Sequence, residues 1–242
     1  MATKDHQSEP IESASETLQR IFDGHGSVLG SQMADESSRY DVLKKTDFPK
    51  PQRTRRIAVA NQKGGVGKTT STVNTAAALA NKGAQVLVID MDPQGNASTA
   101  LGVSHASGEP SVYDVIEGRS DLGDVITVCP DFPTLDVVPA SIDLSGAELE
   151  VADLPNRNTL LKEALDLYLR QSDKHYDYVF IDCPPSLGLL VINAMCAVTE
   201  MLIPIQAEYY ALEGLGQLIN TIGLVQEHFN PVLLVSLSLI HI

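Results

Sequence analysis

Residues 61–70 read NQKGGVGKTT, and this segment constrains the fold of the chain more than any other. The apolar run IAVAN, at 57–61, precedes the glycines, and residues 69–82 have a helix-forming composition. Glycines let successive backbone N–H groups turn toward one anion, and the N-terminus of the following helix adds its positive dipole. The segment therefore predicts a phosphate-binding loop inside a strand–loop–helix unit.

The loop also assigns chemistry to particular side chains. We expect Lys68 to contact the β and γ phosphates of a nucleotide and Thr69 to place its hydroxyl on Mg²⁺. The usual spacing, G-x-x-x-x-G-K-[ST], requires glycine at position 62, but this chain has Gln62 followed by Lys63. The predicted nucleotide-binding residues are Lys63, Gly64, Gly65, Val66, Gly67, Lys68, Thr69 and Thr70.

Two further apolar runs end in carboxylates. VLVID, at 86–90, ends in Asp90 and is followed at i+2 by Asp92, and YVFID, at 178–182, ends in Asp182. Ligands collect at the carboxyl ends of strands in open α/β sheets. One carboxylate of the Asp90/Asp92 pair would orient water and the other would join the metal shell, although a lone aspartate here would also cap a helix. Asp182 has the pattern of a residue beside Mg²⁺, so the predicted metal residues are Thr69, Asp90 and Asp182.

The rest of the chain alternates apolar runs with helical patterns. Strands are expected at 178–182 (YVFID) and 201–205 (MLIPI), and helices at 156–170, 187–198 and 208–229, with a looser stretch up to position 139. Strands that are apolar along their whole length are buried on both faces. The predicted fold class is α/β, a doubly wound and mostly parallel sheet of the phosphate-loop NTPase type.

Composition excludes several classes of protein. With 17 Lys and Arg against 31 Asp and Glu, the formal net charge is -14, which excludes DNA coating through bulk positive charge. Three cysteines without CxxC spacing favour neither a disulfide framework nor a zinc knuckle. An export leader and a membrane-spanning run are not expected, so the predicted location is cytoplasmic.

The two ends differ from the middle in composition. Residues 1–55 are polar and are expected to be a disordered arm and linker, with one short amphipathic helix at 11–22 that is either a solvated feature or a partner-binding peptide. The domain proper is expected at 56–236. The last six residues, LSLIHI, are what CTG TCT CTT ATA CAC ATC encodes, a string similar to a transposon-end sequencing adapter. We therefore expect 237–242 to be an adapter-derived tail on a truncated reading frame, the alternative being a natural apolar tail.

The segments NQKGGVGKTTSTVNTAAALA, VLVIDMDPQGNASTALGV and YVFIDCPPSLGLLVINAM resemble the ParA (Soj) family of chromosome and plasmid partitioning ATPases, which have a deviant phosphate loop. DPQGN distinguishes the chain from the similar MinD-type ATPases. The resemblance implies Mg²⁺-dependent hydrolysis of ATP by an ATP-dependent homodimer. It also implies that Lys63 reaches the partner's phosphates, that Asp92 positions the attacking water, and that Gly64 lies where the two loops meet. The implied catalytic residues are Lys63, Lys68 and Asp92.

The resemblance further implies nonspecific DNA binding by the ATP dimer, a ParB-type partner, no membrane, and association with the nucleoid. The chain has no Lys or Arg after Lys174, so the family's C-terminal DNA-contacting residues are expected to be missing. Arg53, Arg55 and Arg56 form a small cluster that is either a solvated linker or a DNA or partner contact. Two other functions remain open: a nucleotide-gated scaffold for a cargo other than DNA, and an inert fragment.

Overall fold

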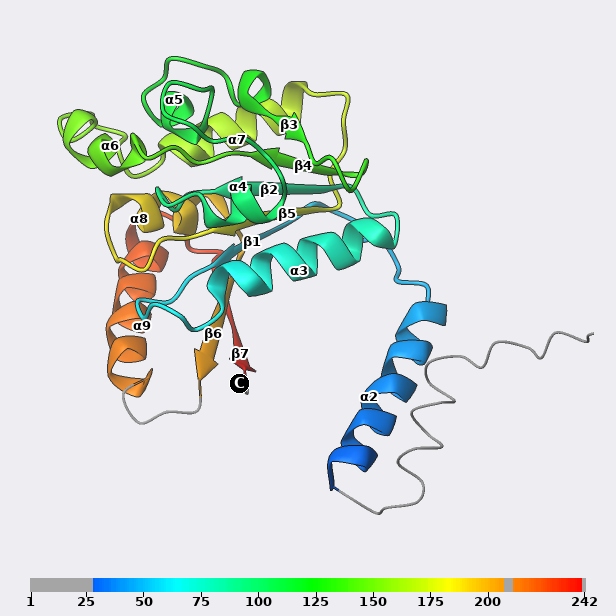
Figure 1. The fold of residues 1–242 in the computed structure, drawn as a ribbon. Helices are drawn as coiled ribbons and strands as arrows, with labels where there is room; N and C mark the ends of the chain where they lie inside the picture. Colours follow the sequence, from blue (N-terminus) through cyan, green and yellow to red (C-terminus); the bar gives the residue numbers. More distant parts are fainter. Residues whose placement is uncertain (1–27, 207–210, 241–242) are drawn as a thin grey trace, which may run out of the picture. The chain divides into compact units, whose positions relative to one another are not determined.

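The computed structural model describes residues 28–206 and 211–240 (Figure 1). The chain divides into two units, Met1–Pro49 and Lys50–Ile242. In the first unit, α2 (Val28–Lys45) is an 18-residue helix that the sequence analysis did not anticipate. Its apolar side chains, among them Tyr40 and Val42, are exposed rather than gathered in one stripe, and that stripe is the signal by which helices were sought. The helix expected at 11–22 lies outside the described residues.

The second unit contains a seven-stranded sheet in the order β3-β4-β2-β5-β1-β6-β7. The strands are β1 (Arg55–Val59), β2 (Val86–Asp90), β3 (Thr127–Val128), β4 (Leu135–Val138), β5 (Tyr178–Asp182), β6 (Glu200–Gln206) and β7 (Leu234–Ile240). The β3–β4 pair is antiparallel, and every other neighbouring pair is parallel. This topology confirms the expected mostly parallel sheet.

Helices cover both faces of the sheet (Figure 1). They are α3 (Lys68–Asn81), α4 (Asn96–Ala100), α5 (Val112–Ile116), α6 (Leu144–Glu150), α7 (Leu160–Gln171), α8 (Leu189–Ala197) and α9 (Ala211–His228), with a 3-10 turn η1 (Leu122–Val125). Helix α3 packs with one hydrophobic cluster, and α5 to α9 pack with the other. None of the described helices is long and apolar enough to cross a membrane.

The central strand β2 explains why a continuous apolar run is needed. Leu87 and Ile89 contribute to the cluster on the α7 and α8 face, whereas Val86 and Val88 contribute to the cluster on the α3 face. All four side chains are completely buried. Successive side chains of a strand point to opposite faces, so a strand covered by helices on both sides has no position left for a polar residue.

The strands and long helices lie within a few residues of their expected positions, but the stretch up to position 139 is more ordered than expected. It holds α4, α5, η1, β3 and β4. Strand β4 was missed because Asp136 interrupts its short apolar run. That carboxylate is buried and is paired with Lys174, at 2.5 Å, and with the Tyr176 hydroxyl.

The C-terminal residues were expected to lie outside the fold, but residues up to Ile240 belong to β7. This strand pairs in parallel with β6, from Glu200 opposite Leu234 to Gln206 opposite Ile240. Backbone pairing accounts for this placement, because a ladder requires extended chain rather than particular side chains. The prediction of an adapter-derived origin stays untested.

Candidate phosphate-binding site

The phosphate-loop segment lies at the carboxyl end of the sheet. Strand β1 lies between β5 and β6, so the loop that leaves β1 at Val59 is flanked by the ends of both neighbours. Val59 is opposite Asp182 in the β1–β5 pair, and Asp90 is opposite Asp182 in the β2–β5 pair. The three predicted motifs, 143 positions apart in total span at their extremes only with β6 included, therefore meet at one edge because their strands are adjacent.

The loop has the conformation that its glycines allow. Gly65 has φ +74° and Gly67 has φ +88°, both in the left-handed region that side chains rarely adopt. Gly67 is the N-cap of α3, so the helix that begins at Lys68 directs its first N–H groups toward the loop. Val66 is completely buried and anchors the loop, which leaves only its backbone for a ligand.

Lys68 is held inside the loop. Its side chain is only 7% exposed, and Nζ donates to the carbonyl oxygen of Lys63 at 3.2 Å. Burial lowers the pKa of the Lys68 ammonium, and the charges of Asp182 and Asp92 oppose that shift. A partly desolvated cation whose nearest counter-charges are carboxylates at the strand ends is suited to binding an anion such as a phosphate.

Asp182 is fully buried between two threonines of α3. The Thr69 hydroxyl donates to Oδ2 at 2.7 Å, and the Thr72 hydroxyl donates to Oδ1 at 2.9 Å. Burial raises the pKa of Asp182 to about 7, and nearby Asp90 adds to the shift. A divalent cation at this point would favour the ionised carboxylate. Thr69 and Asp182 thus lie together, as the sequence predicted.

Asp90 and Asp92 have different surroundings. Asp90 is completely buried, and its Oδ2 accepts hydrogen bonds from the backbone N–H of Ser98 at 2.8 Å and from the Ser98 hydroxyl at 2.7 Å. Its Oδ1 accepts from the N–H of Asp92 at 3.1 Å. Asp90 therefore fixes the loop after β2, and its predicted metal role stays untested.

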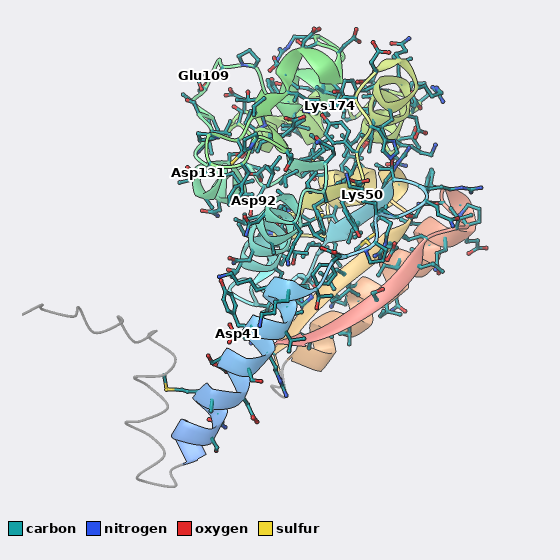
Figure 2. The ribbon with its side chains drawn as sticks, turned by 90° about the vertical axis from the view of Figure 1, so that its right-hand side faces the viewer. Asp41, Lys50, Asp92, Glu109, Asp131 and Lys174 are labelled. Atoms are coloured by element: carbon teal, nitrogen blue, oxygen red, sulfur yellow. The ribbon has the colours of Figure 1, made fainter. Side chains whose placement is uncertain are left out.

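Asp92, labelled in Figure 2, is 6% exposed, and its Oδ1 accepts from the N–H of Gln94 at 3.0 Å. This contact orients the carboxylate within the DPQGN turn. The turn itself is stabilised by Gly95, which has φ +62° and donates its N–H to the Asp92 carbonyl at 2.8 Å. The His105 ring covers Gly95 so closely that a Cβ there would lie 2.4 Å from Nδ1.

The sequence analysis missed the residues of β6 that support the loop. Asn61 donates through Nδ2 to the Pro204 carbonyl at 2.7 Å and accepts at Oδ1 from the N–H of Lys63 at 3.0 Å. Gln206 lies beside both Lys63 and Gly65. The apolar pattern of MLIPI predicted a strand, but a lone glutamine after it carries no signal of its own.

Two side-chain groups outside the motifs have structural partners. Arg55 pairs with Glu200 at 2.6 Å, and Arg56 pairs with Asp166 at 2.5 Å. Both arginines begin β1, so they belong to the sheet rather than to a linker. Cys183 is buried, and burial raises the pKa of its thiol, which agrees with the expectation of a small buried side chain.

The donor set fits magnesium better than a softer metal. Among the described residues there is no group of three or more His, Cys, Asp or Glu side chains that would hold a metal. Magnesium instead uses one or two protein oxygens and completes its shell with water and substrate phosphates. Thr69 and Asp182 supply oxygens of that kind beside the phosphate loop.

Comparisons with known proteins agree with this geometry. Residues 54–235 match the family model described as an AAA domain. The chain is 51% identical over 179 residues to the sporulation initiation inhibitor protein Soj of Bacillus subtilis, covering 74% of this chain and 69% of Soj. The chain belongs to the ParA (Soj) family of partitioning ATPases. It is also 47% identical over 175 residues to the chromosome partitioning protein ParA of Caulobacter vibrioides, covering 72% of this chain and 64% of that protein.

Solved structures of ParA-like folds align over most of the domain. A protein titled cobyrinic acid a,c-diamide synthase from Mycobacterium smegmatis, with bound ADP and magnesium, is 39% identical with a TM-score of 0.70, covering 77% of this chain and 74% of that one. A plasmid partition protein from Borrelia burgdorferi is 27% identical with a TM-score of 0.67, covering 78% of this chain and 79% of that one. The chain spans about two thirds of the length of its Soj and ParA relatives.

Proposed function

We propose that this ParA-family chain binds Mg²⁺-ATP at the 61–70 loop and that the protein hydrolyses it as a homodimer. The observation that carries the proposal is the contact between the Thr69 hydroxyl and Asp182, which joins the phosphate loop to a metal-type carboxylate 113 positions away. The ADP and magnesium bound in the Mycobacterium smegmatis structure support the choice of ligand.

Each predicted residue has a role in this proposal. The loop N–H groups and Lys68 bind the phosphates, and Thr69 and Asp182 hold the magnesium directly or through water. Asp92 orients the attacking water, held in place by the N–H of Gln94. Lys63 stabilises charge on the partner's phosphates in the transition state.

The proposal extends to partition. The names of the Soj and ParA relatives support a role in moving chromosomes or plasmids, with nonspecific DNA and a ParB-type protein as partners. Residues 175–242 contain no Lys or Arg. DNA phosphates must therefore contact basic residues elsewhere in the protein.

The first test is nucleotide binding by the full-length protein carrying Lys68→Ala. This change should abolish ATP binding, because it removes one cation and the side chain that lies within the loop. Lys82→Ala is the matched control, since it removes the same charge just beyond the other end of α3. Undiminished ATP affinity in the Lys68→Ala protein would refute the nucleotide site.

The second test separates a partition ATPase from a scaffold for another cargo. ATP-dependent retention on nonspecific DNA, lost as the salt concentration rises, is expected of the partition ATPase. A protein that dimerises with ATP but shows no such retention at low salt would favour the scaffold.

A further inference from the structure

The side chain of Lys63 lies against a residue that the loop motif does not include. Its Nζ is 3.5 Å from Oε1 of Gln206, the last residue of β6. The other end of the same amide, Nε2, donates to the carbonyl oxygen of Gly65 at 3.4 Å. One side-chain amide thus contacts both the cation and the backbone of the phosphate loop.

The backbone of Lys63 is fixed independently of this contact. Its N–H donates to Asn61 Oδ1 at 3.0 Å, and its carbonyl accepts from Lys68 Nζ at 3.2 Å. Asn61 is itself bonded to the Pro204 carbonyl at 2.7 Å, two residues before Gln206. The end of β6 and the loop therefore keep one relative position, and the Lys63 side chain can move while its backbone does not.

The chemistry of Gln206 suits a contact that must break. Both of its hydrogen bonds are at the long end of the hydrogen-bond range, and the amide is neutral. A carboxylate at this position would form a shorter, charge-assisted bond to the ammonium, roughly twice as strong as a neutral one. An apolar side chain would leave the ammonium and the Gly65 carbonyl without this partner.

We propose that Gln206 is a positioning residue that holds the Lys63 ammonium on its own subunit before dimerisation and releases it to the partner's phosphates. The proposal rests on the proposed function, in which Lys63 acts across the dimer. Because the amide binds the ammonium weakly, the transfer of Lys63 from its own subunit to the partner's phosphates opposes dimerisation only slightly.

The test compares Gln206→Glu with Gln206→Met in the full-length protein with a non-hydrolysable ATP analogue. Gln206→Glu should weaken analogue-driven dimerisation about fivefold at low salt, because the ammonium must leave a charged partner, and the loss should shrink as salt rises. Gln206→Met, similar in shape but unable to form these hydrogen bonds to Lys63, should dimerise at least as readily as the unmodified protein. Sedimentation velocity measures the dimer, and titration measures analogue affinity separately.

Gln217→Glu is the matched control, because it makes the same charge change at an exposed position of α9. It should leave dimerisation unchanged. A Gln206→Glu protein that dimerises normally at low salt, or a Gln206→Met protein that dimerises less readily than Gln206→Glu, would overturn the proposal.

A second measurement needs no dimer and covers the case in which one variant affects the loop itself. In the nucleotide-free protein, Gln206→Glu should raise the unfolding midpoint when Lys63 is present, and this gain should vanish in the Lys63→Met background. An equal change in both backgrounds would show that the carboxylate does not act through Lys63, and would overturn the inference.

The outcomes also separate this inference from the proposed function. If Lys63→Met dimerises normally with the analogue, the in-trans role of Lys63 is wrong, whatever Gln206 does. If Lys63→Met fails to dimerise while Gln206→Glu dimerises normally, the role of Lys63 stands and only the role of Gln206 is wrong.

Discussion

Asp90 and Ser98 are joined twice, through the backbone N–H of Ser98 at 2.8 Å and through its hydroxyl at 2.7 Å. The carboxylate is completely buried, and Ser98 also accepts at Oγ from the N–H of Ala140 at 3.1 Å. This pair closes the segment between β2 and α4 on itself. Asp92, two residues after Asp90, is therefore held by a structure that Asp90 supports.

Replacing Ser98 with alanine should lower the free energy of unfolding by about 1–3 kcal/mol, because a buried carboxylate loses one of its donors. Urea denaturation would measure the loss. Ser104→Ala, at an exposed serine, should change the same free energy by less than about 0.5 kcal/mol. Equal losses in the two variants would contradict the role given to the Asp90–Ser98 pair.

Asp92→Ala should bind ATP, accumulate as a dimer and lose hydrolysis by about 10²–10⁴-fold, because orienting the water is needed only in the transition state. Asp92→Asn retains an oxygen that can accept from the N–H of Gln94, so it should keep the turn and still lose hydrolysis. Steady-state phosphate release and sedimentation report the two properties. Asp131→Asn, at an exposed position labelled in Figure 2, is the surface control. Normal turnover by Asp92→Asn would exclude the carboxylate as the group that orients water.

Gly64→Val should bind ATP as a monomer and fail to dimerise. A Cβ at Gly64 meets no atom within 4 Å in this chain, and its φ is outside the left-handed region, so one subunit alone tolerates a side chain there. Only a second subunit that approaches the loop closely would reject it. Light scattering with ATP measures the dimer, and Gly216→Val, at another open position, is the control. A normal ATP dimer of Gly64→Val would place the subunit contact elsewhere.

Asp166→Asn should lower the free energy of unfolding by about 1 kcal/mol at pH 7, the upper range for a partly exposed ion pair. Burial alone would raise the pKa of Asp166, but Lys162 at 2.7 Å and Arg56 at 2.5 Å lower it overall. Because the folded pKa lies below the unfolded one, the stabilisation is present above the unfolded value and is lost as pH falls through the folded value.

The difference between the unmodified protein and Asp166→Asn should therefore close as the pH falls below about 4. Urea denaturation at a series of pH values measures it. Asp173→Asn, at an exposed aspartate beyond α7, should differ from the unmodified protein by less than about 0.5 kcal/mol across the same range. A gap for Asp166→Asn that widens toward acid pH would reverse the sign assigned to this ion pair.

The sequence by itself determined the elements whose signal is local. The apolar run 86–90 can only be a strand buried on both faces, and β2 has those bounds. Gly65 and Gly67 occur where the backbone needs positive φ, and Lys68 and Thr69 begin the helix. Spacing along the chain carries this information, because a phosphate loop is built from consecutive residues.

Only the tertiary structure decided which distant residues meet. Gln206 reaches Lys63 across 143 positions because β6 lies next to β1, and no pattern near Gln206 indicates this. In the same way, Asp136 broke the apolar pattern of β4 but is buried against Lys174, which approaches from beyond the end of α7. A polar side chain inside a sheet is stabilised by whatever packs over it, and that partner is set by strand order and helix placement rather than by neighbouring residues.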